Sequence, residues 1–326
     1  MHPKDWIRPH PPREFEARSL DLFRYQYRHN AVYRRFCDLL GRTPGQVTHL
    51  EQIPFLPVEM FKRHSVVAAP PPYDAEFLSS GTTGTTPSVH RVKDIAWYER
   101  SLTEGFKYFY GPPQDYVILA LLPSYLERKG SSLVYMARRL MQLSGRPESG
   151  FYLNNLEALR DQLLRLEARG QKTLLLGVSF ALMDFAEHFP MRLQHTIVME
   201  TGGMKGRRRE PVREELHAYL QQRLGIPVVH SEYGMTELLS QAYSKGHGKF
   251  RTPPWMKVLI RDPEDPLDYL PAGRTGGINI IDLANLHSCA FLSVQDLGRK
   301  HPDGSFEVLG RFDNSDIRGC NLLVVG

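Results

Sequence analysis

The spacing of apolar residues divides the chain into stretches with different expected structure. Between residues 13 and 40, side chains such as Phe15, Leu22 and Phe36 recur at roughly helical spacing, which predicts a pair of N-terminal helices. Prolines at positions 54, 57 and 70–72 interrupt any regular element. The region up to Tyr73 is therefore expected to connect the helix pair to a core.

Residues 94–225 alternate between short apolar runs and amphipathic stretches. The runs at 116–122, 173–178, 196–199 and 226–230 are expected to be buried strands, and the stretches at 156–168 and 211–224 are expected to be helices. This alternation predicts an α/β fold with a doubly wound sheet.

Beyond Pro253 the pattern changes to short β-like runs broken by Gly, Pro and Asp. These runs, at 257–260, 277–283, 290–294 and 305–308, predict a small β-rich subdomain. The expected organisation is a helical and Pro-rich segment packed on the core (1–75), an α/β core (76–252), the β-rich subdomain (253–310) and a hinge-like tail that carries Cys320 (311–326).

Composition narrows the classes of partner. Lys and Arg outnumber Asp and Glu by 41 to 36 among 326 residues, and the net charge of +5 favours anionic ligands such as nucleotides. The densest basic run, 205–209, has no interleaved aromatic residues, so no nucleic acid partner is expected. No stretch approaches the roughly 18 to 20 apolar residues of a membrane span, and residues 1–13 carry no apolar signal core, so no membrane span and a cytoplasmic location are expected. The three cysteines are too sparse for a disulfide framework or a zinc cluster.

A run of small residues at 79–87 is the first candidate for chemistry. Its backbone can bend tightly, and its hydroxyls and amides can surround phosphate oxygens. The candidate phosphate ligands are Ser80, Gly81, Thr82, Thr83, Gly84 and Thr85. No Gly-Lys-Ser/Thr follows, so this is not a loop of the Walker type. An ordinary surface loop is the alternative interpretation.

A second candidate, Tyr233-Gly234-Met235-Thr236-Glu237, follows the strand expected to end near His230. Ligands of open α/β sheets bind beyond the carboxyl ends of strands, and a carboxylate such as Glu237 can hold the magnesium ion that accompanies ATP. The alternative is a turn followed by a helix that Thr236 caps.

The third candidate combines Asp296, in Gln-Asp-Leu-Gly, with Arg311, in Gly-Arg-Phe-Asp. A carboxylate can accept hydrogen bonds from both ribose hydroxyls, and a guanidinium can reach ribose or phosphate. Either segment alone could equally be a hairpin turn.

Taken in order, these motifs resemble those of the adenylate-forming superfamily, which includes acyl-CoA ligases and nonribosomal adenylation domains. The order is the Ser/Thr/Gly loop, Gly202-Gly203 after a strand, Tyr-Gly-x-Thr-Glu, Asp-Leu-Gly and Gly-Arg-x-Asp, from about residue 78 onward. The resemblance implies the fold of the N-terminal domain of these enzymes. Their mobile C-terminal domain, with its adenylation lysine, is expected to be essentially absent, because the sequence ends a few residues past the hinge motif.

The resemblance also implies roles for individual residues. The loop residues Thr82, Thr83 and Gly84 would lie at the ATP phosphates, while Gly202 and Gly203 would flank the adenine and acyl pocket. Further roles fall on the later motifs: Tyr233 stacks on adenine, Thr236 contacts the adenylate phosphate, Glu237 binds magnesium, and Asp296 and Arg311 contact the ribose. The lysine that usually trails the phosphate loop is replaced, and His90 and Arg91 are the candidates to supply its charge.

Within the superfamily, the chain resembles the LuxE family of acyl-protein synthetases. The stretches 121–127, 131–133 and 277–285 look like that family, as does a near-terminal cysteine, Cys320, which Arg318 would activate by lowering its pKa. The alternative for Cys320 is a partly buried thiol in a terminal strand. Cys37, on a predicted helix, and Cys289, in an apolar strand, are interpreted as structural. The candidate acyl-site residues are Tyr125, Gly177, His230 and Met235.

The resemblance implies an ATP- and Mg²⁺-dependent ligase. A fatty acid or other carboxylic acid would form an acyl adenylate, Cys320 would accept the acyl group, and a partner protein such as an acyl reductase or carrier would receive it. Two alternatives remain: a truncated acyl- or aryl-CoA ligase, and a non-catalytic subunit that binds a nucleotide or acyl chain. The enzymatic interpretations require residues near 80, Glu237 and Asp296 to converge around one nucleotide.

Overall fold

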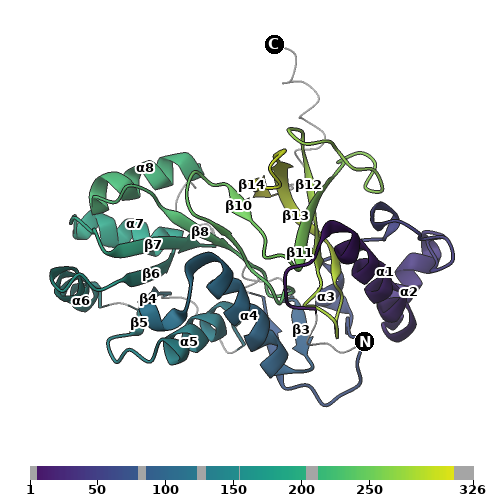
Figure 1. Cartoon of the computed structure of the whole chain (residues 1–326), viewed down its shortest axis with the longest axis horizontal. Coiled ribbons are helices and arrows are strands. Elements are labelled where there is room, and N and C mark those ends of the chain that lie inside the picture. The colour runs from purple at the N-terminus through teal and green to yellow at the C-terminus, as the bar shows by residue number, and fades with distance from the viewer. Residues whose placement is uncertain (1–5, 80–85, 123–129, 154, 203–211, 312–326) are drawn as a thin grey trace, which may run out of the picture.

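The structure is a computed structural model that describes residues 6–79, 86–122, 130–153, 155–202 and 212–311 (Figure 1). The α-helices are α1 (Pro12–His29), α2 (Ala31–Leu39), α3 (Met60–Arg63), α4 (Ile95–Tyr110), α5 (Ser132–Ser144), α6 (Leu156–Ala168), α7 (Ser179–His188) and α8 (Arg213–Leu224). The strands are β1 (Leu56–Pro57), β2 (Ala75–Leu78), β3 (Val89–Val92), β4 (Val117–Leu121), β5 (Gly150–Tyr152), β6 (Thr173–Val178), β7 (Thr196–Thr201), β8 (His230–Tyr233), β9 (Ala242–Ser244), β10 (Phe250–Arg251), β11 (Met256–Arg261), β12 (Thr275–Asp282), β13 (Phe291–Lys300) and β14 (Phe306–Arg311).

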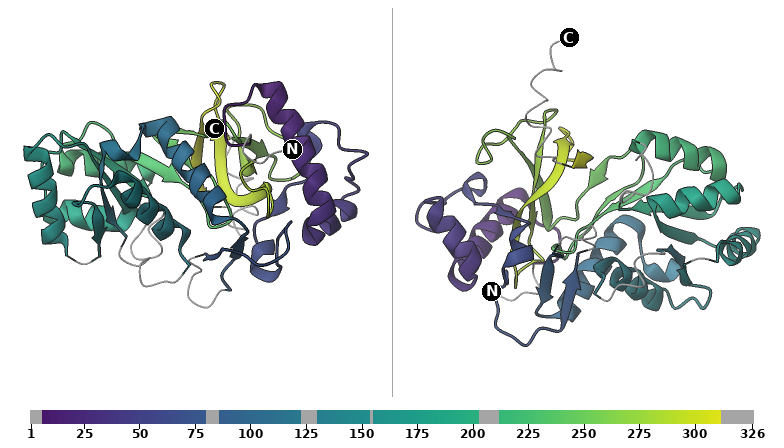
Figure 2. Two further views of the ribbon diagram at one scale, coloured as in Figure 1. Left: turned by 60° about the horizontal axis from the view of Figure 1, so that its bottom comes forward. Right: turned by 180° about the vertical axis from the view of Figure 1, so that it is seen from behind.

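Half of the main sheet is parallel and doubly wound, as predicted. Its strands follow the order β5-β4-β6-β7-β8, with α7 and α8 on one face and α4 and α5 on the other (Figures 1 and 2). Strands β4 and β6 are buried along their whole length, which explains their continuous apolar sequences. Side chains of Asp94, Ser131 and Asn155 accept backbone N–H groups at the starts of α4, α5 and α6, and so fix where these helices begin.

The sheet continues without a break into an antiparallel half. Its order from β8 is β9-β10-β14-β13-β12-β11, and it contains all four β-runs predicted beyond Pro253. One hydrogen-bonded sheet therefore spans the predicted α/β core and the predicted β-rich subdomain. The domain boundaries stay a prediction.

The strand predicted at 226–230 is misplaced. Gly225, at φ +60°, ends α8 in the left-handed conformation, and Pro227 has no N–H to donate to a ladder. Strand β8 instead begins at His230 and runs to Tyr233, beyond the point near His230 where the strand was expected to end. This shift brings the polar sequence His-Ser-Glu-Tyr into the sheet.

The predicted N-terminal helix pair is confirmed and packs on the antiparallel half. Tyr33 of α2 stacks on Phe291 of β13 with ring centroids 6.0 Å apart. The buried Gln26 amide donates to the carbonyls of Asn285 and Leu286 at 2.8 and 3.0 Å. The connecting segment adds its own short strand, since β1 pairs in parallel with β13.

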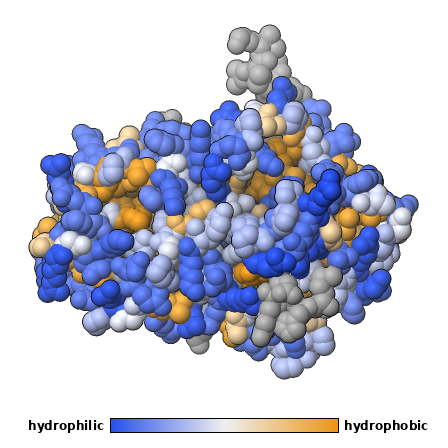
Figure 3. All heavy atoms as spheres, viewed as in Figure 1, coloured by the Kyte–Doolittle hydropathy of each residue, from blue (hydrophilic) through white to orange (hydrophobic). Residues whose placement is uncertain are grey.

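The visible surface is mostly hydrophilic, with apolar residues in separate patches (Figure 3). Within the described ranges, no helix combines the length and the apolar character needed to cross a membrane.

Candidate functional site

The Tyr233–Glu237 motif leaves the sheet at the carboxyl end of β8. Residues 234–240 form an irregular turn, with Leu238 donating to the carbonyl of Met235 at 3.2 Å, and the helix that Thr236 was proposed to cap does not form. Asp282, at the end of β12, holds the far side of this turn. It accepts bonds from the N–H groups of Leu239 and Ser240 at 2.9 and 3.0 Å and from the Ser240 hydroxyl at 2.6 Å.

Asp296 lies beside the start of this turn. The hydroxyl of Tyr233 donates to its Oδ2 at 2.7 Å, and Nε of Arg311 lies 3.9 Å from its Oδ1. Asp296 lies within β13 and pairs with Arg311 of β14, so the hairpin-turn interpretation of Asp296 is wrong. Burial raises the pKa of Asp296, while the Tyr233 hydrogen bond and the charge of Arg311 oppose the rise.

The phosphate-loop segment is anchored on the other side of the turn. Strands β2 and β3 form a hairpin, and Ser79 and Ser88 close its end: the Ser79 N–H donates to the Ser88 carbonyl at 3.0 Å, and the Ser88 N–H donates to the Ser79 hydroxyl at 2.8 Å. Hydrogen bonding from the neighbouring Ser88 side chain lowers the pKa of the Glu237 carboxyl. Nδ1 of the next buried residue on β3, His90, lies 2.8 Å from the Thr236 carbonyl oxygen.

The described parts of all three sequence signals therefore meet at residues 233–237. The remaining predicted site residues lie outside the described residues: Ser80, Gly81, Thr82, Thr83, Gly84, Thr85, Tyr125, Gly203 and Cys320. Gly202 follows β7 directly, as expected, and its φ of +68° is a conformation that favours glycine.

Glu237 is the described candidate for a metal ligand. Its side chain is buried, which raises the pKa of the carboxyl, while hydrogen bonding from Ser88 and the charge of Lys62 oppose the rise. In the part of the chain that the structure describes, no cluster of three or more His, Cys, Asp or Glu residues could form a metal cage. A single carboxylate fits magnesium, which is commonly bound through one or two carboxylates together with substrate phosphates and water.

Comparison with known proteins identifies the family. The model of the family described as "Acyl-protein synthetase, LuxE" matches residues 2–325. The chain belongs to the LuxE acyl-protein synthetase family. The predicted family and the predicted class of enzyme, a ligase, are thereby confirmed.

One relative and two solved structures are also similar to this chain. The chain is 22% identical to the long-chain-fatty-acid–luciferin-component ligase of Vibrio harveyi over 323 residues, which cover 92% of this chain and 84% of that protein. It matches the ATP-bound MatB of Rhodopseudomonas palustris with a TM-score of 0.54 and 19% identity, over 76% of this chain and 49% of that one. It matches a 2-hydroxyisobutyryl-CoA ligase with R3-HIB-AMP with a TM-score of 0.69 and 13% identity, over 94% and 69%. The chain thus spans about half the length of the MatB structure. The adenylate-forming fold is confirmed.

In this LuxE-family chain, neither His90 nor Arg91 is free to supply the positive charge of the lysine that usually trails the phosphate loop. Burial lowers the pKa of His90 to about 4, so its ring is neutral at physiological pH. Arg91 is engaged at the hairpin, with Nε 2.8 Å from Glu76 and a terminal nitrogen 3.0 Å from the Ser65 hydroxyl. The charge prediction is thus wrong for His90, because burial and not sequence position sets its state.

Two functional candidates escaped the sequence analysis. Arg213, the first residue of α8, lies 3.4 Å from Glu200, donates to the Val308 carbonyl of β14 at 2.8 Å and is one of the charges that lower the pKa of Asp296. Glu232 lies beyond the predicted strand 226–230, yet its carboxyl is buried in β8 and accepts a short hydrogen bond from Thr201. Burial raises the pKa of Glu232 to about 7. The strand that contains Glu232 was misplaced, and its polar residues form no apolar pattern from which the sequence analysis could have predicted it.

The described candidates for the acyl site are Gly177, His230 and Met235. A Cβ at Gly177 would lie 2.7 Å from Leu182 of α7, so close helix packing explains this glycine. His230 begins β8, about 10 Å along the strand from Tyr233. Its Nδ1 lies 3.1 Å from the Tyr110 hydroxyl, and burial lowers its pKa to about 4. Met235 is half-buried, with its sulfur 3.9 Å from the Tyr233 hydroxyl.

The two described cysteines are inert. Both are buried and free, and burial raises the pKa of Cys37 to about 12 and that of Cys289 further still. Cys289 lies in the loop before β13, not in a strand as predicted.

Proposed function

We propose that this chain uses ATP to convert a medium- or long-chain fatty acid into an acyl adenylate and then transfers the acyl group to Cys320. The observation that carries the proposal is the convergence at residues 233–237. Within this short segment, Tyr233 contacts Asp296 and Glu237 contacts Ser88 at the end of the phosphate-loop hairpin. Ribose, phosphate and metal sites of one nucleotide then lie along a single turn.

The chemistry has two steps. A carboxylate oxygen of the acid forms a bond to the α-phosphorus of ATP as the bond to pyrophosphate breaks. The Cys320 thiolate then attacks the acyl carbonyl carbon, and AMP leaves. The thioester passes the acyl group to a partner protein, such as an acyl reductase or a carrier, in the cytoplasm.

The described residues have distinct tasks in the first step. Asp296 accepts hydrogen bonds from the ribose hydroxyls, and Thr236 contacts the α-phosphate. Glu237 holds Mg²⁺, which neutralises charge on the phosphates when bound. The proposal draws support from the V. harveyi relative, whose name includes a long-chain fatty acid, and from a solved structure of the same fold with bound ATP.

Labelled fatty acid and ATP test the proposal directly. The wild-type chain should acquire a hydroxylamine-sensitive label and should exchange pyrophosphate into ATP when the acid is present. Cys320→Ser should lose the label and keep the exchange, while the buried Cys37→Ser serves as the matched control and should keep both.

Other outcomes identify the alternatives. AMP release that depends on coenzyme A, without labelled protein, would assign the chain to the CoA ligases. The absence of any pyrophosphate exchange would leave a non-catalytic binding subunit.

A further inference from the structure

Two successive carbonyl groups in the Thr236–Glu237 turn are held by side chains from different elements. Nδ1 of His90, on β3, lies 2.8 Å from the Thr236 carbonyl oxygen, and Nδ2 of Asn285, after β12, donates to the Glu237 carbonyl oxygen at 2.8 Å. Both side chains are fully buried, with exposures of 1% and 0%. Because a carbonyl only accepts, these contacts require an N–H at Nδ1 of His90 and at the Asn285 amide.

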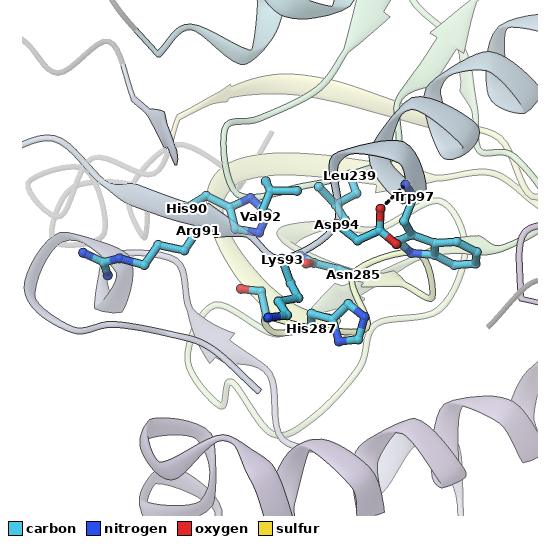
Figure 4. A pocket seen from close by; sticks show the side chains of 10 residues that line it. His90, Arg91, Val92, Lys93, Asp94, Trp97, Leu239, Asn285 and His287 are labelled. Atoms are coloured by element: carbon cyan, nitrogen blue, oxygen red, sulfur yellow. Dashed lines mark hydrogen bonds between the residues drawn. The ribbon is translucent and has the colours of Figure 1, made fainter. Parts of the chain in front are cut away.

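The two residues also face each other. Figure 4 shows His90 and Asn285 at one small pocket, with Arg91 directed away from it. Burial keeps the His90 ring neutral, with a pKa of about 4. A neutral imidazole holds one proton, and the Thr236 carbonyl fixes it on Nδ1.

This pair connects the two halves of the candidate ATP site. His90 follows Ser88 by two residues on β3, and Ser88 closes the phosphate-loop hairpin and lowers the pKa of the Glu237 carboxyl by hydrogen bonding. Asn285 lies in the loop that follows Asp282 at the end of β12. The Asp282 carboxyl in turn accepts hydrogen bonds from the N–H groups of Leu239 and Ser240, which follow Glu237. Any movement of the hairpin relative to Glu237 must break the His90 bond.

We propose that His90 and Asn285 are positioning residues that hold Thr236 and Glu237 in register with the phosphate-loop hairpin and thereby set the affinity for Mg–ATP. The inference rests on the proposed function, and it gives the 277–285 stretch a role in the site. The role proposed for both residues is indirect, through the backbone carbonyls of Thr236 and Glu237.

Two substitutions at His90 distinguish the effect of its Nδ1–H donor from the effect of losing the histidine ring. In His90→Asn the amide nitrogen occupies the same bond distance from Cα as Nδ1, so the bond to Thr236 can form. In His90→Gln the amide nitrogen moves one atom further out, to the place of Nε2. Asn30→Ala is the matched control, since Asn30 is a buried amide whose side chain bonds the Ser288 carbonyl at 3.2 Å and the Tyr33 N–H at 3.0 Å instead of the Thr236–Glu237 turn.

Calorimetric binding of ATP, with Mg²⁺ and with EDTA, is measured for each variant together with Tm. His90→Gln should weaken Mg–ATP binding by about 10- to 100-fold, as substitutions behind metal ligands do, while His90→Asn should stay near wild type. Asn30→Ala should lower Tm and leave binding unchanged. Binding by His90→Gln equal to that of wild type, or equal losses in both His90 variants, would overturn the proposal.

Two further outcomes complete the test. If His90→Gln does not fold, Asn285→Leu, which removes the donor to Glu237, is measured in its place. If neither folds, the pair serves stability alone and the proposal is wrong. If the wild-type chain itself does not bind Mg–ATP, the proposed function is wrong.

Discussion

Substituting Asp296 by Asn should separate nucleotide recognition from stability. Within the described residues the carboxyl accepts one hydrogen bond, from Tyr233 at 2.7 Å, while Arg311 stands 3.9 Å from the other oxygen, so acceptor capacity remains for a ribose. A hydrogen bond to a charged acceptor contributes about 1.5–3 kcal/mol. The asparagine keeps one acceptor oxygen and loses the other, so ATP should bind about 10- to 150-fold more weakly.

Stability should respond in the opposite direction. Burial raises the pKa of Asp296, so keeping this side chain ionised costs the folded state free energy at neutral pH. The neutral amide removes that cost and can still accept from Tyr233, so Tm at pH 7.5 should not fall.

Calorimetry with ATP, 2′-deoxyATP and 3′-deoxyATP supplies the assay. Wild type should prefer ATP over both analogues, and Asp296→Asn should lose most of that preference. Asp303→Asn is the control, because Asp303 is an exposed carboxylate that pairs with Arg251 on the β13–β14 turn. An unchanged preference in Asp296→Asn would refute the assignment of the ribose to this residue.

Three further substitutions test other parts of the structure. Glu237→Gln should raise the Mg²⁺ concentration needed for half-maximal pyrophosphate exchange by about 10- to 100-fold, and an unchanged magnesium titration would contradict its assignment as the ligand. Glu232→Gln should flatten the pH dependence of unfolding: the folded pKa of about 7 lies above the unfolded value of 4.5, so wild type loses stability, on the order of 3 kcal/mol, as pH rises between these values. Urea titrations from pH 5 to 8 measure this loss, and equal slopes for both proteins would show that Glu232 does not carry it. Gly177→Ala should destabilise by about 1–3 kcal/mol through the clash with Leu182, without changing the acyl-chain preference, and an unaltered Tm would argue against the packing role.

The elements that the sequence predicted well are those that packing alone determines. Strand β6 and helix α6 have their predicted bounds, because one is buried on both faces and the other shows a single apolar side. Strand β8 was misplaced because its polar residues are stabilised by distant partners, Glu232 by Thr201 and Tyr233 by Asp296. A hydrophobic pattern contains no information about such pairs.

The candidate site shows the same division. Motif order predicted that the Ser/Thr/Gly loop, Glu237 and Asp296 belong together, and their described parts do meet. It could not predict that His90 is neutral, since its protonation state depends on burial under the Thr236 turn. Nor could it find Arg213, whose place beside Asp296 comes from the packing of α8 against the sheet.

Four carboxyl groups of the described residues lie in or beside the segment 233–240: Glu232, Glu237, Asp282 and Asp296. The differences between them indicate which one is available to a cation. Asp282 accepts four hydrogen bonds, from Leu239, from Ala284 and twice from Ser240, which use the roughly four acceptor sites of a carboxylate. Glu232 lies close to its midpoint of protonation at neutral pH, because burial raises its pKa to about 7. Asp296 is shared between Tyr233 and the charge of Arg311. In the ranges that the structure describes, hydrogen bonding from Ser88 and the charge of Lys62 lower the pKa of Glu237 against the effect of burial, so these neighbours favour its ionised form. A magnesium ion brought by ATP would therefore be held at Glu237, beside the end of the phosphate-loop hairpin.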